Sequence, residues 1–260
     1  MCDNCNTPLE VALKSWDGEM KKFPTKCKCQ KESELKRKEL EEKENQIRKL
    51  RELKRYSLMD DEFKNCTFEN YKIDKDNHSL YKIATNYCKE WVDMKKESIG
   101  LLIHGNPGIG KSYATFCIAN ELISQMVPVI AISSIGLIGK IYDSYRKYGT
   151  EGEYSIISTF NNADLLVLDD LGAEHESHRE KEKQLLYSVI DTRIRNGKPM
   201  VVTANLTLPQ LKEKLTTDDG VARTYDRLMG MCTPIKVEGE SKRILRAREK
   251  QKEVLNRLLK

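Results

Sequence analysis

The 260-residue sequence has no apolar run that approaches the roughly 20 residues needed to span a membrane. Its first residues, MCDNC, offer neither the basic start nor the apolar core of a secretory signal peptide. Hydrophobic residues make up only 39% of the chain and charged residues 33%, so much of the charge is expected on exposed helices and tails. These absences argue against a membrane protein and predict a cytoplasmic one.

No internal repeat is visible, and the length leaves room for one full α/β domain and a small appendage. The net charge of +5 comes from the last twenty residues, which hold eight Lys or Arg against two Glu, so the preceding 240 residues carry a charge of −1. A basic tail of this kind fits contact with nucleic acid and a solvated helix face equally well. Charge alone therefore does not identify a partner.

The segment GNPGIGKS, residues 105–112, matches the phosphate-loop pattern GxxxxGK[ST] and follows an apolar stretch, residues 99–104. Residues 111–126 have the spacing of an amphipathic helix, so the loop has the flanking strand and helix that the pattern requires. Small residues allow successive backbone N–H groups to converge on a phosphate at the positive end of that helix. Lys111 would then reach the β- and γ-phosphates, and the Ser112 hydroxyl would bind Mg²⁺. The predicted contacts with ATP or GTP are made by Gly105, Asn106, Pro107, Gly108, Ile109, Gly110, Lys111, Ser112 and Tyr113.

Two carboxylates, Asp169 and Asp170, stand at the end of an apolar strand predicted over residues 165–169. Phosphate-loop enzymes need acidic groups at this place. Asp169 is expected to support Mg²⁺ through water, and Asp170 to polarise the water that attacks the γ-phosphate. A purely structural role for Asp170, capping the end of the strand, is the alternative.

Three further polar residues are candidates for contact with the γ-phosphate. Asn205 follows another predicted strand, residues 199–203, and its amide could bridge the attacking water and the phosphate, although Asn is also an ordinary turn residue. Arg227 and Arg243 could each stabilise the charge that develops in the transition state. For a lone arginine, a solvated surface position is the more common role.

Strands and helices alternate along the chain from about residue 60. Strands are predicted over residues 99–104, 128–133, 165–169, 199–203 and 234–238, and helices over 111–126, 135–147, 180–196 and 208–214. Such alternation predicts an α/β fold with a parallel sheet covered by helices on both faces. Residues 149–153 and 216–220 are expected to be mobile loops.

Four of the eight cysteines, Cys2, Cys5, Cys27 and Cys29, lie in the first 29 residues in the pattern C-x2-C-x21-C-x-C. Residues 11–16 and 19–23 predict a hairpin with an Asp-Gly turn, which would bring the two pairs together. So small a segment buries too little apolar surface to fold alone, so one tetrahedral Zn²⁺ is expected to stabilise it. Disulfides and free thiols are the alternatives, and the C-x-C spacing is less usual for zinc. Residues 1–30 are therefore interpreted as a small zinc-binding domain similar to a zinc ribbon, and the other cysteines as buried thiols.

Residues 30–56 hold ten Lys or Arg and seven Glu and contain neither Gly nor Pro. This composition predicts a long, mostly solvated helix. Its apolar positions do not keep a heptad spacing, which argues against a coiled coil. Residues 31–59 are interpreted as a charged helical linker that precedes a nucleotide-binding domain over residues 60–260.

Together these motifs resemble those of the AAA+ helicase loaders of bacteria and phages, of the DnaC and DnaI type, within the IstB-like ATP-binding superfamily. The likeness covers roughly residues 60–245 and is carried by GNPGIGKS (105–112), LLVLDDLGAE (165–174), TAN (203–205), YDRL (225–228), SKR (241–243) and the lead-in FKNCTFENY (63–71). It implies an AAA+ fold, Mg²⁺-dependent ATP hydrolysis and assembly into an ATP-dependent oligomer. It further implies that the protein helps to place a DnaB-type replicative helicase on single-stranded DNA during DNA replication.

The same resemblance implies a role for each candidate residue. Lys111 and Ser112 would be the Walker A pair, Asp169 and Asp170 Walker B, Asn205 sensor 1, Arg227 the arginine finger and Arg243 sensor 2. The cysteine-rich front resembles the zinc-bearing helicase-binding domain of such loaders. Asp170 departs from the Glu that many AAA+ enzymes carry, which leaves the rate of hydrolysis open.

Basic and aromatic residues mix over residues 140–148, a combination suited to tracking a single strand of DNA. Lys140, Arg146 and Lys147 are expected to contact the DNA, while the apolar residues of the same helix face the core.

Three other functions fit parts of the pattern. An IstB-like transposition ATPase has a similar core, and the cysteine cluster favours a loader over it. A DnaA-like initiator needs a helix-turn-helix domain, for which the roughly twenty residues after the last strand are too few. A nucleotide-gated adaptor with little hydrolysis is the third alternative, supported by the short carboxylate of Asp170.

Overall fold

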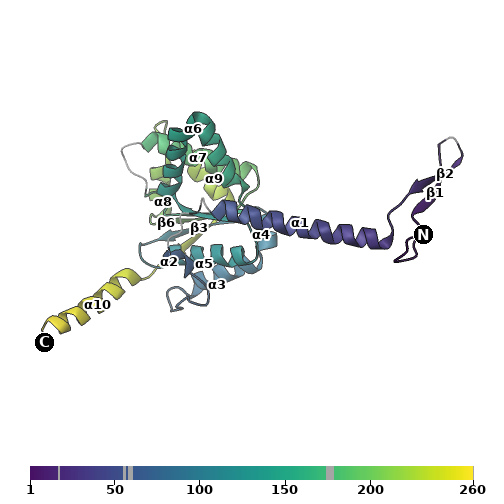
Figure 1. Cartoon of the computed structure of the whole chain (residues 1–260). Helices are drawn as coiled ribbons and strands as arrows, with labels where there is room; N and C mark the ends of the chain where they lie inside the picture. The colour runs from purple at the N-terminus through teal and green to yellow at the C-terminus, as the bar shows by residue number, and fades with distance from the viewer. Residues whose placement is uncertain (17, 55–56, 58–60, 174–178, 260) are drawn as a thin grey trace. The chain divides into compact units, whose positions relative to one another are not determined.

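A computed structural model describes the chain except for residues 17, 55–56, 58–60, 174–178 and 260, so Asp17 of the predicted hairpin turn lies outside the described residues. The described residues form two compact units, Met1–Lys49 and Leu50–Lys260 (Figure 1). The boundary between them falls within one long helix, α1 (Lys28–Lys54). In the part of the chain that the structure describes, no helix is both long enough and apolar enough to cross a bilayer.

The first unit contains an antiparallel hairpin of β1 (Glu10–Lys14) and β2 (Met20–Pro24), in which Val11 pairs with Phe23. Every residue of the two strands is exposed. A two-stranded ribbon without a core is marginally stable, so this hairpin needs support from another source. The predicted hairpin is present, and the predicted long charged helix is present as α1, with residues 55–56 of the prediction outside the described residues.

The second unit is built on five parallel strands: β3 (Gly100–Gly105), β4 (Val129–Ser133), β5 (Leu165–Asp169), β6 (Met200–Ala204) and β7 (Cys232–Val237). Their order in the sheet is β4-β5-β6-β3-β7, and every neighbouring pair is parallel. Strands covered on both faces need apolar side chains at nearly every position, which explains runs such as LLVLD. The carboxyl ends of β5, β6 and β3 meet side by side at one edge of the sheet, and the predicted polar residues follow these ends.

Helices cover both faces of this sheet (Figure 1). One face packs against α2 (Asp61–Lys64), α3 (His78–Lys89), α4 (Trp91–Lys96) and α5 (Lys111–Ser124). The other packs against α6 (Ser134–Asn162), α7 (Arg179–Arg195), α8 (Leu208–Leu215) and α9 (Arg223–Met231). The last helix, α10 (Lys242–Leu258), has no buried residue. The predicted parallel sheet flanked by helices is therefore confirmed.

Helix α6 corrects the prediction. It runs from Ser134 to Asn162, so the predicted helix end at residue 147 and the predicted loop over residues 149–153 are wrong. The segment is not straight, because a Cβ placed on Gly152 would lie 2.7 Å from the carbonyl oxygen of Ser144. Eight residues of straight helix would separate these positions by about 12 Å. The chain thus folds back within the helical segment, and a residue without a side chain permits the close approach.

The segment over residues 216–220, expected to be a mobile loop, forms a hydrogen-bonded turn. The Gly220 N–H donates to the Thr217 carbonyl at 2.8 Å, and Arg223 donates to the Asp219 carboxylate at 2.5 Å. This turn leads directly into α9, a helix that the sequence pattern did not predict.

Candidate nucleotide-binding site

The phosphate loop connects the carboxyl end of β3 to the amino end of α5. Gly105, Gly108 and Gly110 have positive φ angles of 147°, 82° and 97°, a backbone conformation that favours glycine. Space imposes the same choice at the first two positions. A Cβ on Gly105 would overlap the carbonyl oxygen of Val237, and a Cβ on Gly108 would overlap the hydroxyl of Ser241. The loop is therefore enclosed by the end of β7 and the start of α10.

Lys111, the first residue of α5, is only 5% exposed, and its ammonium group donates to three oxygens. These are the carbonyl oxygens of Gly105 (2.8 Å) and Asn106 (2.7 Å) and the side-chain Oδ1 of Asn205 (2.7 Å). Burial lowers the pKa of Lys111 to about 8, and nearby carboxylates oppose that shift. The loop thus holds a desolvated cation whose hydrogen bonds can be exchanged for phosphate oxygens.

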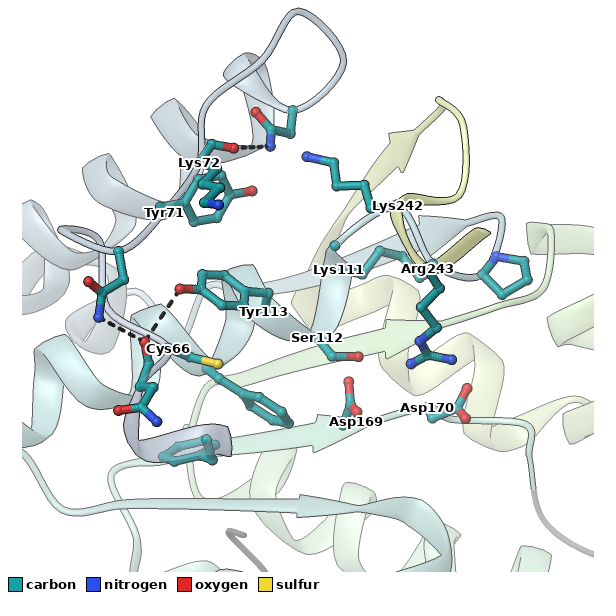
Figure 2. Close-up of a pocket in the computed structure, with 18 of the residues that line it drawn as sticks. Cys66, Tyr71, Lys72, Lys111, Ser112, Tyr113, Asp169, Asp170, Lys242 and Arg243 are labelled. Carbon is teal, nitrogen blue, oxygen red and sulfur yellow. Dashed lines mark hydrogen bonds between the residues drawn. The ribbon is translucent and has the colours of Figure 1, made fainter. Parts of the chain in front are cut away.

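Asp169, the last residue of β5, accepts hydrogen bonds from two hydroxyl groups. Thr203 Oγ1 donates to Asp169 Oδ1 at 2.6 Å, and the Ser112 hydroxyl also donates to this carboxylate. Burial raises the pKa of Asp169, and the two hydroxyl groups oppose the rise. Figure 2 shows the side chains of Ser112 and Asp169 facing each other. Hydroxyl and carboxylate oxygens are ligands that Mg²⁺ accepts, so these residues fit the predicted metal site.

Asp170, the next residue, has a left-handed backbone with a φ of 56°. Its N–H donates to Thr203 Oγ1 at 2.8 Å, and its carbonyl accepts from the Ser134 hydroxyl at 2.9 Å. Its carboxylate accepts from Asn205 Nδ2 at 2.6 Å. Because Asn205 also accepts from Lys111, these three residues form one chain of hydrogen bonds from the phosphate loop to the strand end.

Arg243, near the start of α10, lines the same cavity and points toward the two carboxylates (Figure 2). The backbone N–H of Lys242 donates to the Gly108 carbonyl at 2.9 Å, and its side chain forms a 2.6 Å ion pair with Asp74. The beginning of α10 is thus fixed both to the phosphate loop and to the segment before α3.

The cavity around these residues has a volume of about 630 Å³, within the usual range of small-molecule sites. Its far end is lined by aromatic rings. Phe63 and Phe116 have ring centres 4.6 Å apart, and Tyr71 and Tyr113 have ring centres 5.4 Å apart. A phosphate loop at one end and aromatic rings at the other fit the triphosphate and the base of a nucleotide.

Two contributors to this site were given no role from the sequence. Thr203 lies inside a buried strand, where a β-branched residue is an ordinary sheet former. Its hydroxyl nevertheless donates to the Asp169 carboxylate and accepts from the Asp170 N–H. The hydroxyl of Tyr71 is buried beside the cavity and has no hydrogen-bond partner among the described residues. The only sequence signal for either was membership in the quoted motifs TAN and FKNCTFENY.

The remaining predicted residues lie away from the cavity. Arg227 on α9 forms an ion pair with Asp191 on α7, in which Nε and Oδ1 are 3.1 Å apart. On α6, Lys140 is half-buried and Arg146 is exposed, whereas the side chain of Lys147 lies outside the described part of the structure.

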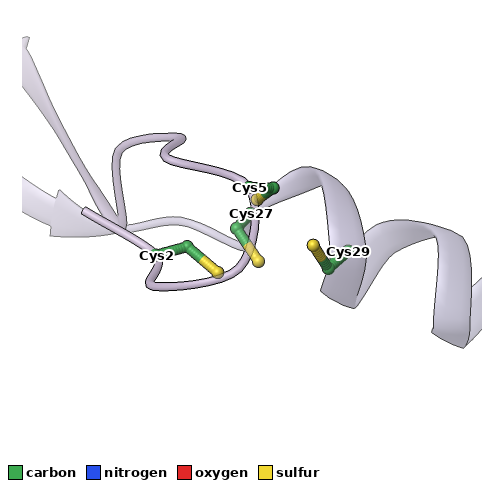
Figure 3. Close-up of side chains that lie close together, drawn as sticks. All are labelled: Cys2, Cys5, Cys27 and Cys29. Atoms are coloured by element: carbon green, nitrogen blue, oxygen red, sulfur yellow. The ribbon is translucent and has the colours of Figure 1, made fainter.

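The four N-terminal cysteines come together in the first unit, with all four Sγ atoms within 4.8 Å of one another (Figure 3). Zinc bound by four thiolates places the sulfurs about 3.8 Å apart, so small shifts would complete a tetrahedral site. A hydrogen bond from Thr7 lowers the pKa of Cys5 to about 5, whereas a hydrogen bond to Cys5 raises that of Cys29 to about 12. A bound cation would allow all four thiols to ionise, so the donor set fits Zn²⁺.

Comparison with known proteins gives a consistent result. The family model described as IstB-like ATP binding protein matches residues 13–252. The replicative helicase loader DnaC of Escherichia coli (strain K12) is 27% identical over 175 residues, which cover 67% of this chain and 69% of DnaC. The replicative helicase loader DnaI of Bacillus subtilis (strain 168) is 23% identical over 256 residues, which cover 93% of this chain and 76% of DnaI. A crystal structure of DnaI has the same fold, with a TM-score of 0.57 and 23% identity over 72% of this chain and 95% of that one.

Proposed function

The chain belongs to the IstB-like ATP-binding protein family, and we propose that it is a cytoplasmic AAA+ ATPase that helps to place a DnaB-type replicative helicase on single-stranded DNA. The nucleotide chemistry rests on one observation, the hydrogen-bond chain from Lys111 through Asn205 to Asp170. The role in loading is supported by the two relatives, which are both replicative helicase loaders.

In this proposal ATP binds with its phosphates on the loop and against Lys111. Ser112 would hold Mg²⁺ directly and Asp169 would hold it through water, and the ion would neutralise charge on the phosphate oxygens. Asp170 would orient the attacking water and accept its proton. Arg243 would contact the γ-phosphate from within the same subunit.

Arg227 lies outside the cavity of its own chain, so it would serve the nucleotide of a neighbouring subunit, and hydrolysis would depend on assembly. Lys140, Arg146 and Lys147 would contact the backbone of single-stranded DNA. The cysteine-bearing first unit would bind the helicase.

The test uses the purified chain, a replicative helicase and a circular single-stranded DNA. We expect ATP-dependent retention of the helicase on the circle. Arg146→Glu should weaken binding of the protein to the DNA circle but keep its binding to the helicase. Cys27→Ser should weaken binding to the helicase but keep binding to the DNA. Lys89→Glu reverses a charge that is also exposed, on α3, and is the matched control.

Two outcomes contradict the proposal. Capture of a transposase in place of a helicase would favour the IstB-like transposition ATPase. If the wild-type protein turns over ATP no faster than Asp170→Asn, with or without single-stranded DNA, the result would favour a nucleotide-gated adaptor.

A further inference from the structure

Asp191 is a largely buried carboxylate that does not line the nucleotide cavity. It lies on α7 with its side chain 13% exposed, and its two oxygens face two different arginines. Oδ2 accepts a hydrogen bond from Arg195 Nε at 2.6 Å, one helical turn along α7. Oδ1 lies 3.1 Å from Nε of Arg227 on α9 and has no hydrogen bond within the described residues. Arg195 and Arg227 together compensate the charge of this carboxylate, and Arg227 is the cation that faces Oδ1.

The ion pair with Asp191 restricts the side chain of Arg227, which the fixed backbone alone would leave free to change rotamer. Helix α9 packs against α7 and is anchored by the buried Thr224 and Leu228, so the backbone of Arg227 is fixed. Its side chain is still 39% exposed, and arginine in solvent samples many rotamers. Asp191 contacts Nε, the inner nitrogen of the guanidinium group. The two outer nitrogens, which grip phosphate oxygens as a fork, are not used by this contact.

We propose that Asp191 is a positioning residue that presents the outer nitrogens of Arg227 to the γ-phosphate of ATP bound by a neighbouring subunit. The inference rests on the proposed function, in which Arg227 acts between subunits. An arginine stabilises the charge of the transition state effectively only when it is already in position before the reaction. A misplacement of about 1 Å costs up to about 100-fold in rate. An ion pair at the inner nitrogen supplies that orientation and leaves the phosphate-binding edge available.

Subunit mixing tests the proposal. Asp191→Asn keeps the side-chain shape and removes the charge. Assembled on single-stranded DNA, this variant should lose about 10- to 100-fold of the ATPase rate, while its affinity for ATP stays unchanged. Mixed with Lys111→Ala subunits, which lack a working pocket but keep the Arg227–Asp191 pair, it should recover partial activity. Mixed with Arg227→Ala subunits it should recover none, because neither partner offers a positioned arginine.

Two further variants separate positioning from stability. Arg195→Ala removes the other partner of the same carboxylate and keeps the Arg227 contact, so it should remain close to the wild-type rate. Asp191→Glu restores the charge and should recover part of the activity lost in Asp191→Asn. If Asp191 has a purely structural role, the mixtures of Asp191→Asn with Lys111→Ala and with Arg227→Ala should be equally inactive. That result overturns the proposal.

The outcome for Arg227 distinguishes failure of this inference from failure of the proposed function. An inactive Arg227→Ala together with a fully active Asp191→Asn rejects positioning alone. A fully active Arg227→Ala rejects the proposed role of Arg227 between subunits and the inference with it.

Discussion

Raising the pH from 7 to 9 should weaken ATP binding about tenfold, and most of the loss should come from Lys111. Burial lowers the pKa of this side chain to about 8, well under the ordinary value for lysine. Its ammonium group donates to three oxygens within 2.8 Å, and ATP binding would replace these with phosphate oxygens. Only the charged form attracts the phosphates.

The magnitude follows from the fraction of charged lysine. With a pKa of about 8, about nine tenths of the free protein carries the charge at pH 7 and about one tenth at pH 9. The bound phosphates raise the pKa of the same group, because an opposite charge favours the ammonium form. The sign is therefore fixed: affinity is nearly full at pH 7, falls by about half at pH 8, and above that falls by up to tenfold for each further pH unit.

Isothermal titration calorimetry between pH 7 and 9.5 measures this directly. Experiments in two buffers with different ionisation enthalpies should show uptake of nearly one proton per ATP above pH 8. Lys111→Arg is the control, since a guanidinium group stays charged throughout this range, and whatever affinity it retains should not change with pH. A wild-type affinity that stays flat to pH 9.5, or an equal decline in the arginine variant, would refute the role given to Lys111.

Four other changes test the remaining parts of the site. Metal analysis should find one zinc per chain, and Cys27→Ser or a strong chelator should remove it; unchanged metal content in Cys27→Ser would reject the site. Asp170→Asn should bind ATP normally and lose hydrolysis, so an equal loss of binding would make Asp170 structural. Thr203→Val removes a hydrogen bond that opposes the raised pKa of Asp169, so the ATPase rate should begin to fall at a higher pH as the solution is acidified. Thr203→Ser keeps the hydroxyl and should keep the wild-type pH profile. Tyr71→Phe removes a buried hydroxyl that has no partner in the described structure, so it should raise the melting temperature without nucleotide and reduce the further rise caused by ATP.

The phosphate loop and the sheet could be predicted because their sequence signals are local. Gly105 and Gly108 have positive φ angles, a backbone conformation that favours glycine and therefore leaves a mark in the sequence of the loop itself. Strands β3 to β6 are continuous apolar runs, because both of their faces are buried. Residues at the carboxyl ends of adjacent parallel strands then meet at one edge of the sheet, regardless of the conformation of the loops between them. The positions of Asp170 and Asn205 therefore follow from the strand ends, and that of Lys111 follows from the phosphate-loop pattern after β3.

Features that depend on contacts between distant segments could not be predicted in this way. The fold-back inside α6 depends on Gly152 approaching the Ser144 backbone, and periodicity gives no sign of a bend. The partner of Arg227 is Asp191, 36 positions earlier on another helix. The packing of α9 on α7 creates that pair, and neither residue stands out within its own segment. The Thr203 hydroxyl was missed for the same reason, since its partners lie on the neighbouring strand.

The geometry at Asp170 explains how an aspartate can occupy a place where many AAA+ enzymes have glutamate. A left-handed conformation at a residue other than glycine costs of order 1–3 kcal/mol and persists only where the surroundings enforce it. Here Thr203 binds the N–H, Ser134 binds the carbonyl and Asn205 binds the carboxylate. The left-handed backbone directs the short side chain of Asp170 into the cavity. The carboxylate is therefore brought close to the nucleotide site by the main chain, where glutamate would use its additional methylene group. Lengthening the side chain at a fixed backbone would carry the carboxylate past Asn205 Nδ2, and Asp170→Glu should therefore hydrolyse ATP more slowly than the wild type, as single-turnover kinetics would show.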